Sequence, residues 1–164
     1  MPKPHVDRTF ATTHQASRAG TDIDHIVIHY TTSDNIEGTI DHFINGDAGT
    51  SAHYIVGRDG ELVQMVPDNL SAQHARNMNR RSIGIEHVAK RGQRLTPEQS
   101  DKSLALVRWL MATYAVPRAN VIPHKCVGST DCFGDILADY GATIASNCTG
   151  QREAVSRWLA SVGL

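Results

Sequence analysis

The sequence predicts an α/β fold, with one mixed central β-sheet flanked by helices. Three observations lead to this prediction. Short β-branched runs alternate along the chain with segments of helical periodicity. The length of 164 residues suits one domain. No internal repeat, glycine-rich phosphate loop or interdomain linker interrupts the order. We expect residues 1–22, which are polar and aperiodic, to form an N-terminal arm, and residues 23–164 to form the folded domain.

Four segments have the pattern of strands. Residues 24–30 are a β-branched run that ends in polar residues, which predicts a buried strand whose C-terminal end opens onto a site. Residues 52–56 and 61–66 flank an Asp-Gly pair, which is a hairpin signal. Residues 82–88 alternate apolar and polar side chains and predict a further strand.

Three segments have the pattern of helices. Residues 36–44 carry apolar side chains at helical spacing, with a glycine where the helix should stop. The clearest helix begins at Thr96, which is followed by Pro97 and by Gln99 in the capping-box position. An apolar stripe at spacings of three and four extends this helix to about residue 114. The last helix is amphipathic and lies near residues 150–161.

Composition points to an ordinary globular protein, with 40% hydrophobic residues, 20% charged residues and a net charge of −1. No apolar run approaches the roughly 20 residues that span a bilayer. The first residues lack the apolar core of a secretory signal, so we expect synthesis in the cytoplasm. Residues 76–94 contain six basic side chains and one acid, Glu86. This stretch is either a solvated loop or a contact for an anionic polymer. Without a basic helix or an aromatic-interleaved strand, we expect no nucleic-acid partner. The expected oligomeric state is a monomer.

The cysteine count favours thiols over disulfides. Three cysteines are an odd number and too few for a disulfide scaffold. In the cytoplasm reduced thiols are the default. Cys126 and Cys148 are expected to be free, although pairing stays open if the protein reaches an oxidising space. At least one cysteine is then available as a metal ligand.

Two histidines and one cysteine have positions that suit a metal site. His29 ends the first predicted core strand, and His124 and Cys132 lie eight positions apart (132 − 124), so that one loop can turn both toward one point. Imidazole and thiolate suit zinc, and three protein ligands leave a fourth position open, as in catalytic sites. The alternative is a half-exposed histidine and a buried, packed cysteine. Spacing alone does not decide between them.

The local sequences around these residues occur in a recognisable order. They are residues 26–31 (IVIHYT), residues 51–60 with their Ser-Ala-His-Tyr and Asp-Gly, residues 82–86 (SIGIE), and His124 followed by Thr-Asp-Cys at 130–132. Together they resemble the zinc-dependent N-acetylmuramoyl-L-alanine amidases, which include phage amidase-type lysozymes, peptidoglycan recognition proteins and muropeptide-recycling amidases. The resemblance implies a mixed-sheet α/β catalytic domain with one zinc ion per chain. It assigns the zinc ligands to His29, His124 and Cys132.

Glu86 and Thr130 are the predicted catalytic residues. Hydrolysis of an amide needs a general base, and Glu86 ends a strand that should lie beside the strand of His29. By resemblance, its position has the acid/base role in the recycling branch of the family. The alternative is a surface carboxylate on an alternating strand. The lysozyme and recognition-protein branches have a catalytic tyrosine where this chain has Ala52, and several branches have a lysine at Thr130. The Thr130 hydroxyl can donate to an oxyanion but brings no full charge.

His53 and His74 are further candidates. His53 precedes Tyr54 on an inward-facing strand, where we expect a hydrogen-bonded residue close to the metal. The segment around His74 resembles the substrate groove of the family, so His74 either contacts glycan or peptide or is a surface histidine.

The resemblance implies hydrolysis of the amide bond between N-acetylmuramic acid and the L-alanine of the stem peptide in bacterial peptidoglycan. We favour a phage or prophage endolysin that reaches the wall through holin pores, because the cysteine ligand is typical of the phage-lysozyme branch. A cytoplasmic muropeptide-recycling amidase is the alternative that Glu86 favours. A non-catalytic peptidoglycan-binding module is disfavoured, because such modules usually lack the cysteine that Cys132 provides.

Overall fold

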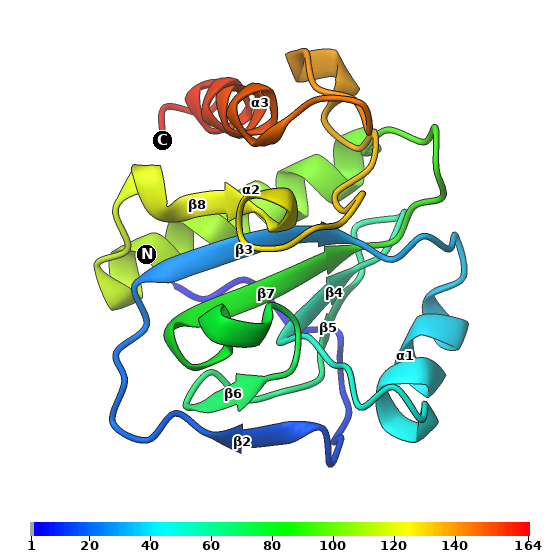
Figure 1. Ribbon diagram of the computed structural model, residues 1–164, viewed down its shortest axis with the longest axis vertical. Coiled ribbons are helices and arrows are strands. Elements are labelled where there is room, and N and C mark those ends of the chain that lie inside the picture. The colour runs from blue at the N-terminus through cyan, green and yellow to red at the C-terminus, as the bar shows by residue number, and fades with distance from the viewer. Residues whose placement is uncertain (1) are drawn as a thin grey trace.

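The predicted α/β class is confirmed by a computed structural model, which describes residues 2–164 (Figure 1). The strands are β1 Arg8–Thr9, β2 Gln15–Ser17, β3 His25–Tyr30, β4 Tyr54–Val56, β5 Leu62–Gln64, β6 Leu70–Ala72, β7 Ser82–His87 and β8 Val121–Pro123. The α-helices are α1 Ile36–Asn45, α2 Pro97–Tyr114 and α3 Cys148–Ala160. Short 3-10 helices are η1 Arg76–Arg81, η2 Arg118–Asn120, η3 His124–Cys126 and η4 Ala138–Tyr140.

Six strands form one mixed sheet in the order β1-β5-β4-β7-β3-β8. Strands β4, β7, β3 and β8 run parallel, whereas β5 is antiparallel to β4, so the hairpin predicted at Asp59-Gly60 is confirmed. Strands β2 and β6 pair separately as a small antiparallel sheet. Parallel strands end at a common edge, and this edge carries the candidate site.

Helices cover both faces of the large sheet (Figure 1). On one face, α2 and α3 contribute apolar side chains such as Leu106, Leu110 and Trp158 to a core with the inward residues of β3 and β7. On the other face, α1 packs Ile40 and Phe43 against apolar residues of β4 and β5. Side chains alternate along each strand, so β4 and β5 contribute to both cores, whereas Val27 of β3 and Ile122 of β8 form a third, smaller cluster on the α1 side.

The capping signals predicted for α2 are present. The Thr96 hydroxyl accepts from the backbone N–H of Gln99, and the Gln99 side chain accepts from the backbone N–H of Thr96. The Gln99 amide also donates to the carbonyls of Val56 and Val88, so this buried side chain ties the start of α2 to the ends of β4 and β7.

The predicted N-terminal arm is docked on the domain. Strand β1 pairs with β5, and β2 pairs with β6. The buried Arg18 guanidinium donates to the carbonyls of Asp68, Arg80 and Ser82, and so ties this segment to the loops around η1. Two- and three-residue strands have too few side chains to show an alternating pattern, which is why the sequence predicted only an arm.

The basic stretch 76–94 is partly neutralised on the surface. Arg81, Lys90 and Arg94 form ion pairs with Asp24, Asp34 and Asp139, respectively. These pairs favour the solvated-surface interpretation over a contact for an anionic polymer. Among residues 2–164 no helix is both long and apolar enough to cross a membrane.

The expectation of free thiols at Cys126 and Cys148 is wrong. The two sulfur atoms form a disulfide, which joins η3 to the first residue of α3 across 22 positions of sequence. The physical reason is proximity: the loop after β8 returns over the start of α3, and the two Cα atoms lie 4.9 Å apart. Cys132 is the free cysteine of the described chain.

Removing this disulfide should destabilise the fold. A loop of this length, once closed, lowers the entropy of the unfolded chain enough to contribute about 3 kcal/mol. We therefore expect the double variant Cys126→Ser/Cys148→Ser to melt about 6–12 °C below the parent in calorimetry. A reducing agent should lower the melting temperature of the parent and leave that of the variant unchanged. Equal melting temperatures of parent and variant under oxidising conditions would contradict the prediction.

Candidate metal centre and active site

Three parallel strands bring the candidate residues to one edge of the sheet. His29 is the next-to-last residue of β3, and Glu86 is opposite it on β7 in the parallel register. This confirms the predicted neighbourhood of the two strands. His124 directly follows β8, which pairs with the other side of β3. Since Ile28 and Ile85 face the core under α2, His29 and Glu86 project from the opposite face.

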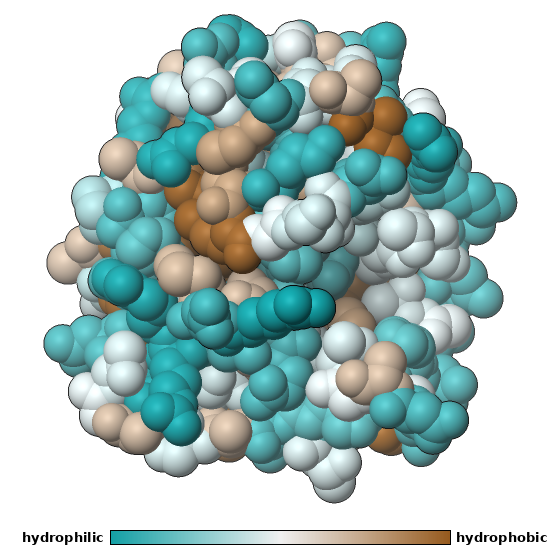
Figure 2. Space-filling model, viewed as in Figure 1, coloured by the Kyte–Doolittle hydropathy of each residue, from teal (hydrophilic) through white to brown (hydrophobic). Residues whose placement is uncertain are grey.

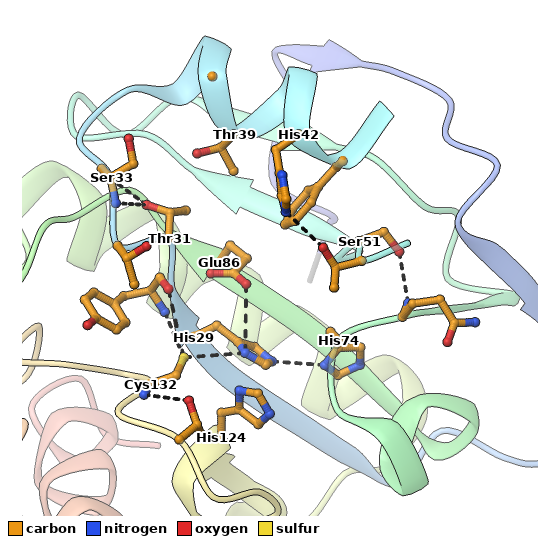
Figure 3. A pocket seen from close by; sticks show the side chains of 17 residues that line it. His29, Thr31, Ser33, Thr39, His42, Ser51, His74, Glu86, His124 and Cys132 are labelled. Carbon is orange, nitrogen blue, oxygen red and sulfur yellow. Dashed lines mark hydrogen bonds and ion pairs between the residues drawn. The ribbon is translucent and has the colours of Figure 1, made fainter. Parts of the chain in front are cut away.

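The loop after η3 delivers the third candidate ligand. Its Cys132 sulfur accepts a hydrogen bond from the backbone N–H of Tyr30 at 3.3 Å, which fixes it beside the end of β3. The Thr130 hydroxyl oxygen accepts from the backbone N–H of Cys132 at 3.1 Å, so Thr130 also shapes this loop. Figure 3 shows His29, His124 and Cys132 pointing toward one another from β3, from the start of η3 and from the loop.

The spacing of these three side chains fits a small tetrahedral cation. Their donor atoms all lie within 4.8 Å of one another, and the His29 Nδ1 to Cys132 Sγ distance is 3.6 Å. Ligand distances of zinc to nitrogen and sulfur imply about 3.5 Å between two such ligands in a tetrahedron. One sulfur and two imidazole nitrogens are a donor set that zinc prefers, and three donors leave a fourth position for water or substrate. The residues therefore fit the metal that the sequence predicted.

Burial keeps the candidate ligands neutral. It holds the pKa of His29 well below its usual value, and neighbouring histidines lower it further. The pKa of His124 is lowered by burial and by the charge of Arg76. Both imidazoles therefore carry a lone pair at neutral pH. Burial, with the nearby Glu86 carboxyl, raises the pKa of the Cys132 thiol well above its usual value. A divalent cation opposes that shift, since a coordinating thiol loses its proton.

Glu86 is a buried carboxyl group with an uncommitted oxygen. Its Oε1 lies 3.9 Å from His29 Nδ1, and its buried Oε2 has no hydrogen-bond partner among residues 2–164. Burial raises the pKa of Glu86 to about 8. An unpartnered buried carboxyl oxygen is costly, which makes it a mark of functional chemistry. The alternative of a surface carboxylate does not hold, because the side chain is 13% exposed.

His74 lines the groove beside His29, whereas His53 is fully buried next to His74. His74 Nδ1 is 3.0 Å from His29 Nε2, as the dashed line in Figure 3 shows, and burial holds the pKa of His74 well below its usual value. His53 is fully buried, accepts from the backbone N–H of Gly84 through Nδ1, and contacts the carbonyl of Leu70 through Nε2. His53 thus has the expected hydrogen bonds, and its ring packs edge-on against that of His74, which packs in the same way against that of His29.

A groove of about 530 Å³ opens in front of the three candidate ligands. Its far wall is α1 and the segments before α1 and β4, as the close view in Figure 3 shows. Uncharged hydroxyl groups dominate this wall: Thr31, Thr32, Ser33, Thr39, Thr50 and Ser51. Sequence reasoning missed them, because single serines and threonines in loops have no distinguishing pattern. In Figure 2 the visible surface is largely hydrophilic, with small apolar areas.

Comparison with known proteins identifies the family of this site. Residues 19–135, more than half of the chain, match the N-acetylmuramoyl-L-alanine amidase family Amidase_2. The chain belongs to this amidase family. The matched range includes both histidines, the cysteine and Glu86.

Individual amidases of the family are similar over shorter stretches. N-acetylmuramoyl-L-alanine amidase A of Achromobacter lyticus is 44% identical over 62 residues, which are 37% of this chain and 35% of that protein. The amidase XlyA of Bacillus subtilis (strain 168) is 34% identical over 97 residues, or 57% of this chain and 32% of that protein. The match thus spans about a third of the length of either relative.

Solved amidase structures share the fold. The endolysin N-acetylmuramoyl-L-alanine amidase LysCS from Clostridium intestinale URNW aligns with a TM-score of 0.67 and 26% identity, over 79% of this chain and 89% of that one. The similarity extends beyond the strands around His29 to most of the domain.

Two buried histidines outside the ligand set predict acid sensitivity. Burial lowers the pKa of His53 to about 3 and that of His87 to about 4. The unfolded chain therefore takes up protons below about pH 6.5 that the folded amidase domain cannot, and stability falls as the pH drops from there toward 4. Each group contributes up to about 1.4 kcal/mol per pH unit in this window.

Urea unfolding between pH 7 and pH 4.5 measures this slope. His87→Asn, whose amide can replace the hydrogen bond from Nδ1 to the His29 carbonyl, should reduce the slope by about one proton. The exposed His5→Asn is the control and should leave the slope unchanged. A slope that is equal in all three proteins would show that His87 is not the titrating group.

Proposed function

We propose that this chain is a zinc-dependent amidase that hydrolyses the bond between N-acetylmuramic acid and L-alanine in bacterial peptidoglycan. One observation carries the proposal: His29, His124 and Cys132 converge within 4.8 Å beside a buried carboxyl group, at the floor of an open groove. Membership of the amidase family supports the substrate class. The ligand and catalytic roles of single residues are part of the proposal.

The side chains have complementary tasks in this reaction. A zinc ion held by His29, His124 and Cys132 supplies Lewis acidity toward an amide carbonyl and toward water. Glu86 Oε2 has no hydrogen bond of its own within residues 2–164, so it is available to take a proton from the attacking water and return it to the leaving amine. The Thr130 hydroxyl lines the groove and can donate to the carbonyl oxygen as negative charge develops there.

The groove suits an uncharged, hydroxyl-rich ligand beside the scissile bond. The hydroxyl groups of Thr31, Thr39 and Ser51 donate to backbone carbonyls and offer only lone pairs to a ligand. Those of Thr32, Ser33 and Thr50 can both donate and accept, as recognition of a sugar requires. The ligands lie at one side of this wall, so a muramoyl group bound along it would present its lactyl carbonyl to the metal. Peptidoglycan is accordingly the proposed partner, and a monomer is the proposed state.

The disulfide bears on where the enzyme acts. Disulfides persist in oxidising spaces and are rare in the cytoplasm. The Cys126–Cys148 bridge therefore favours action at the cell wall, as in an endolysin released through holin pores. A cytoplasmic recycling amidase is the second candidate, and Glu86 is the residue that favours it.

Product analysis tests the reaction. Purified peptidoglycan treated with the protein should yield free stem peptides that begin with L-alanine, with intact glycan strands, in mass spectrometry. Exhaustive chelation should abolish this release, and stoichiometric zinc should restore it, because the metal supplies the electrophilic catalysis. Release that survives metal removal would refute the metal mechanism. Binding to the wall without any release would favour the binding module instead. Faster cleavage of small anhydro-muropeptides than of polymeric wall would favour recycling.

Glu86→Gln should separate catalysis from metal binding. The amide keeps the size of the side chain but cannot accept the proton, so we expect hydrolysis to fall by on the order of 10²–10⁴-fold while the protein keeps one zinc per chain. Turnover and metal content are measured on the same sample. Thr130→Val is the comparison variant and should lose less activity. Turnover at the parental rate in Glu86→Gln would show that Glu86 is not the general base. A loss of activity in Thr130→Val as large as that in Glu86→Gln would show that Thr130 is a principal catalytic residue.

A further inference from the structure

The second ring nitrogen of His29 takes part in a hydrogen-bonded chain that leads away from the groove. We propose that His74 is a positioning residue that fixes the tautomer of His29, so that the lone pair of His29 Nδ1 faces His124 and Cys132. The inference deepens the proposed function, because it concerns the same metal centre. It assigns His74 a role other than contact with glycan or peptide.

The direction of each hydrogen bond follows from the far end of the chain. The carbonyl of Met78 only accepts, so the Ser82 hydroxyl must donate to it, at 2.6 Å. The Ser82 oxygen then accepts from the N–H at His74 Nε2, at 3.1 Å. A neutral imidazole with its proton on Nε2 has a lone pair on Nδ1.

That lone pair determines the protonation of His29. His74 Nδ1 accepts from His29 Nε2, at 3.0 Å, so the single proton of His29 resides on Nε2. His29 Nδ1 is left with a lone pair, and this is the nitrogen that lies 3.6 Å from Cys132 Sγ. Had the proton been on Nδ1, an N–H group would point at the ligand cluster and block coordination.

Packing holds the His74 ring in this position. A Cβ atom on Gly84 would lie 2.6 Å from both Cγ and Nδ1 of His74, so the ring needs the bare backbone of β7 beneath it. The backbone N–H groups of His74 and Ala75 both donate to the Asn79 side chain, which fixes the backbone from which the His74 ring extends. One face of β7 carries the alternate residues Ser82, Gly84 and Glu86. Ser82 accepts the hydrogen bond from His74, Gly84 leaves room for the His74 ring, and Glu86 brings its carboxyl group beside His29.

Zinc affinity and nitrogen NMR test this assignment. Partners that orient a metal-bound histidine typically contribute 10–100-fold to metal affinity. We expect His74→Phe, and Gly84→Ala through displacement of the ring, to weaken zinc binding by that factor in chelator competition. His74→Gln can accept from His29 and donate to Ser82, and should recover part of the loss. His25 lies at the opposite end of β3 from His29, so His25→Phe is the matched control and should bind zinc like the parent.

The zinc-loaded parent protein provides a readout that does not depend on any variant. Side-chain ¹⁵N spectra should show His29 with zinc on Nδ1 and a proton on Nε2, and His74 with a proton on Nε2 only. Zinc on His29 Nε2, or a proton on His74 Nδ1, would overturn the inference even if the variants fail to fold. Parental zinc affinity in folded His74→Phe would overturn it as well.

The outcome is separable from that of the proposed function. If zinc binding depends on His74 but peptidoglycan is not cleaved, the proposed reaction fails and the positioning role stands. If cleavage requires zinc and His74→Phe keeps the parental affinity, only the positioning role fails.

Discussion

The site depends on the parallel pairing of β3 with β7 in one register. This pairing sets His29 opposite Glu86 and sends both side chains to the same face of the sheet. A shift of β3 by one residue against β7 would turn the side chains of β3 to the opposite faces, which would bury His29 under α2, move Ile28 out of that core and separate His29 from Glu86. The core under α2 therefore enforces the geometry of the site, because the apolar residues of both strands are buried there only in this register. Strand β8 then needs only to end beside β3 to bring His124 to the same edge.

Much of this arrangement was predictable from the sequence. Alternation along residues 82–88 and the β-branched run before His29 are properties of the local sequence, and they identified both strands and the polar end of the first. The capping signals at Thr96 likewise reflect local hydrogen bonds, so the start of α2 was predicted to the residue. The meeting of His29, His124 and Cys132 did not follow from spacing. It came from the resemblance of four ordered motifs, because contacts between distant segments depend on topology that periodicity does not encode.

The features that were not predicted also depend on contacts between distant segments. Cys126 and Cys148 pair because a loop folds back onto α3, whereas composition and compartment had favoured free thiols. Strands β1 and β2 are too short for a periodic pattern and form only where β5 and β6 offer an edge. The bond between His74 and His29 joins residues 45 positions apart. Its only local sign is Gly84 in the middle of a strand, where a glycine often marks close approach by another group.

The centre combines groups that burial alone would keep neutral. Burial lowers the pKa of His29 and raises those of Glu86 and Cys132, so a proton remains on each acid and a lone pair on the imidazole. Keeping such groups out of water destabilises the fold unless partners compensate. A divalent cation reverses the balance, since it favours the thiolate and the carboxylate together. Metal binding at this site would therefore also stabilise the fold. In the proposed metal centre, the sheet and the chain of hydrogen bonds through His74 would hold the three candidate ligands at coordinating distance, and a bound cation would supply the charge that makes their burial favourable.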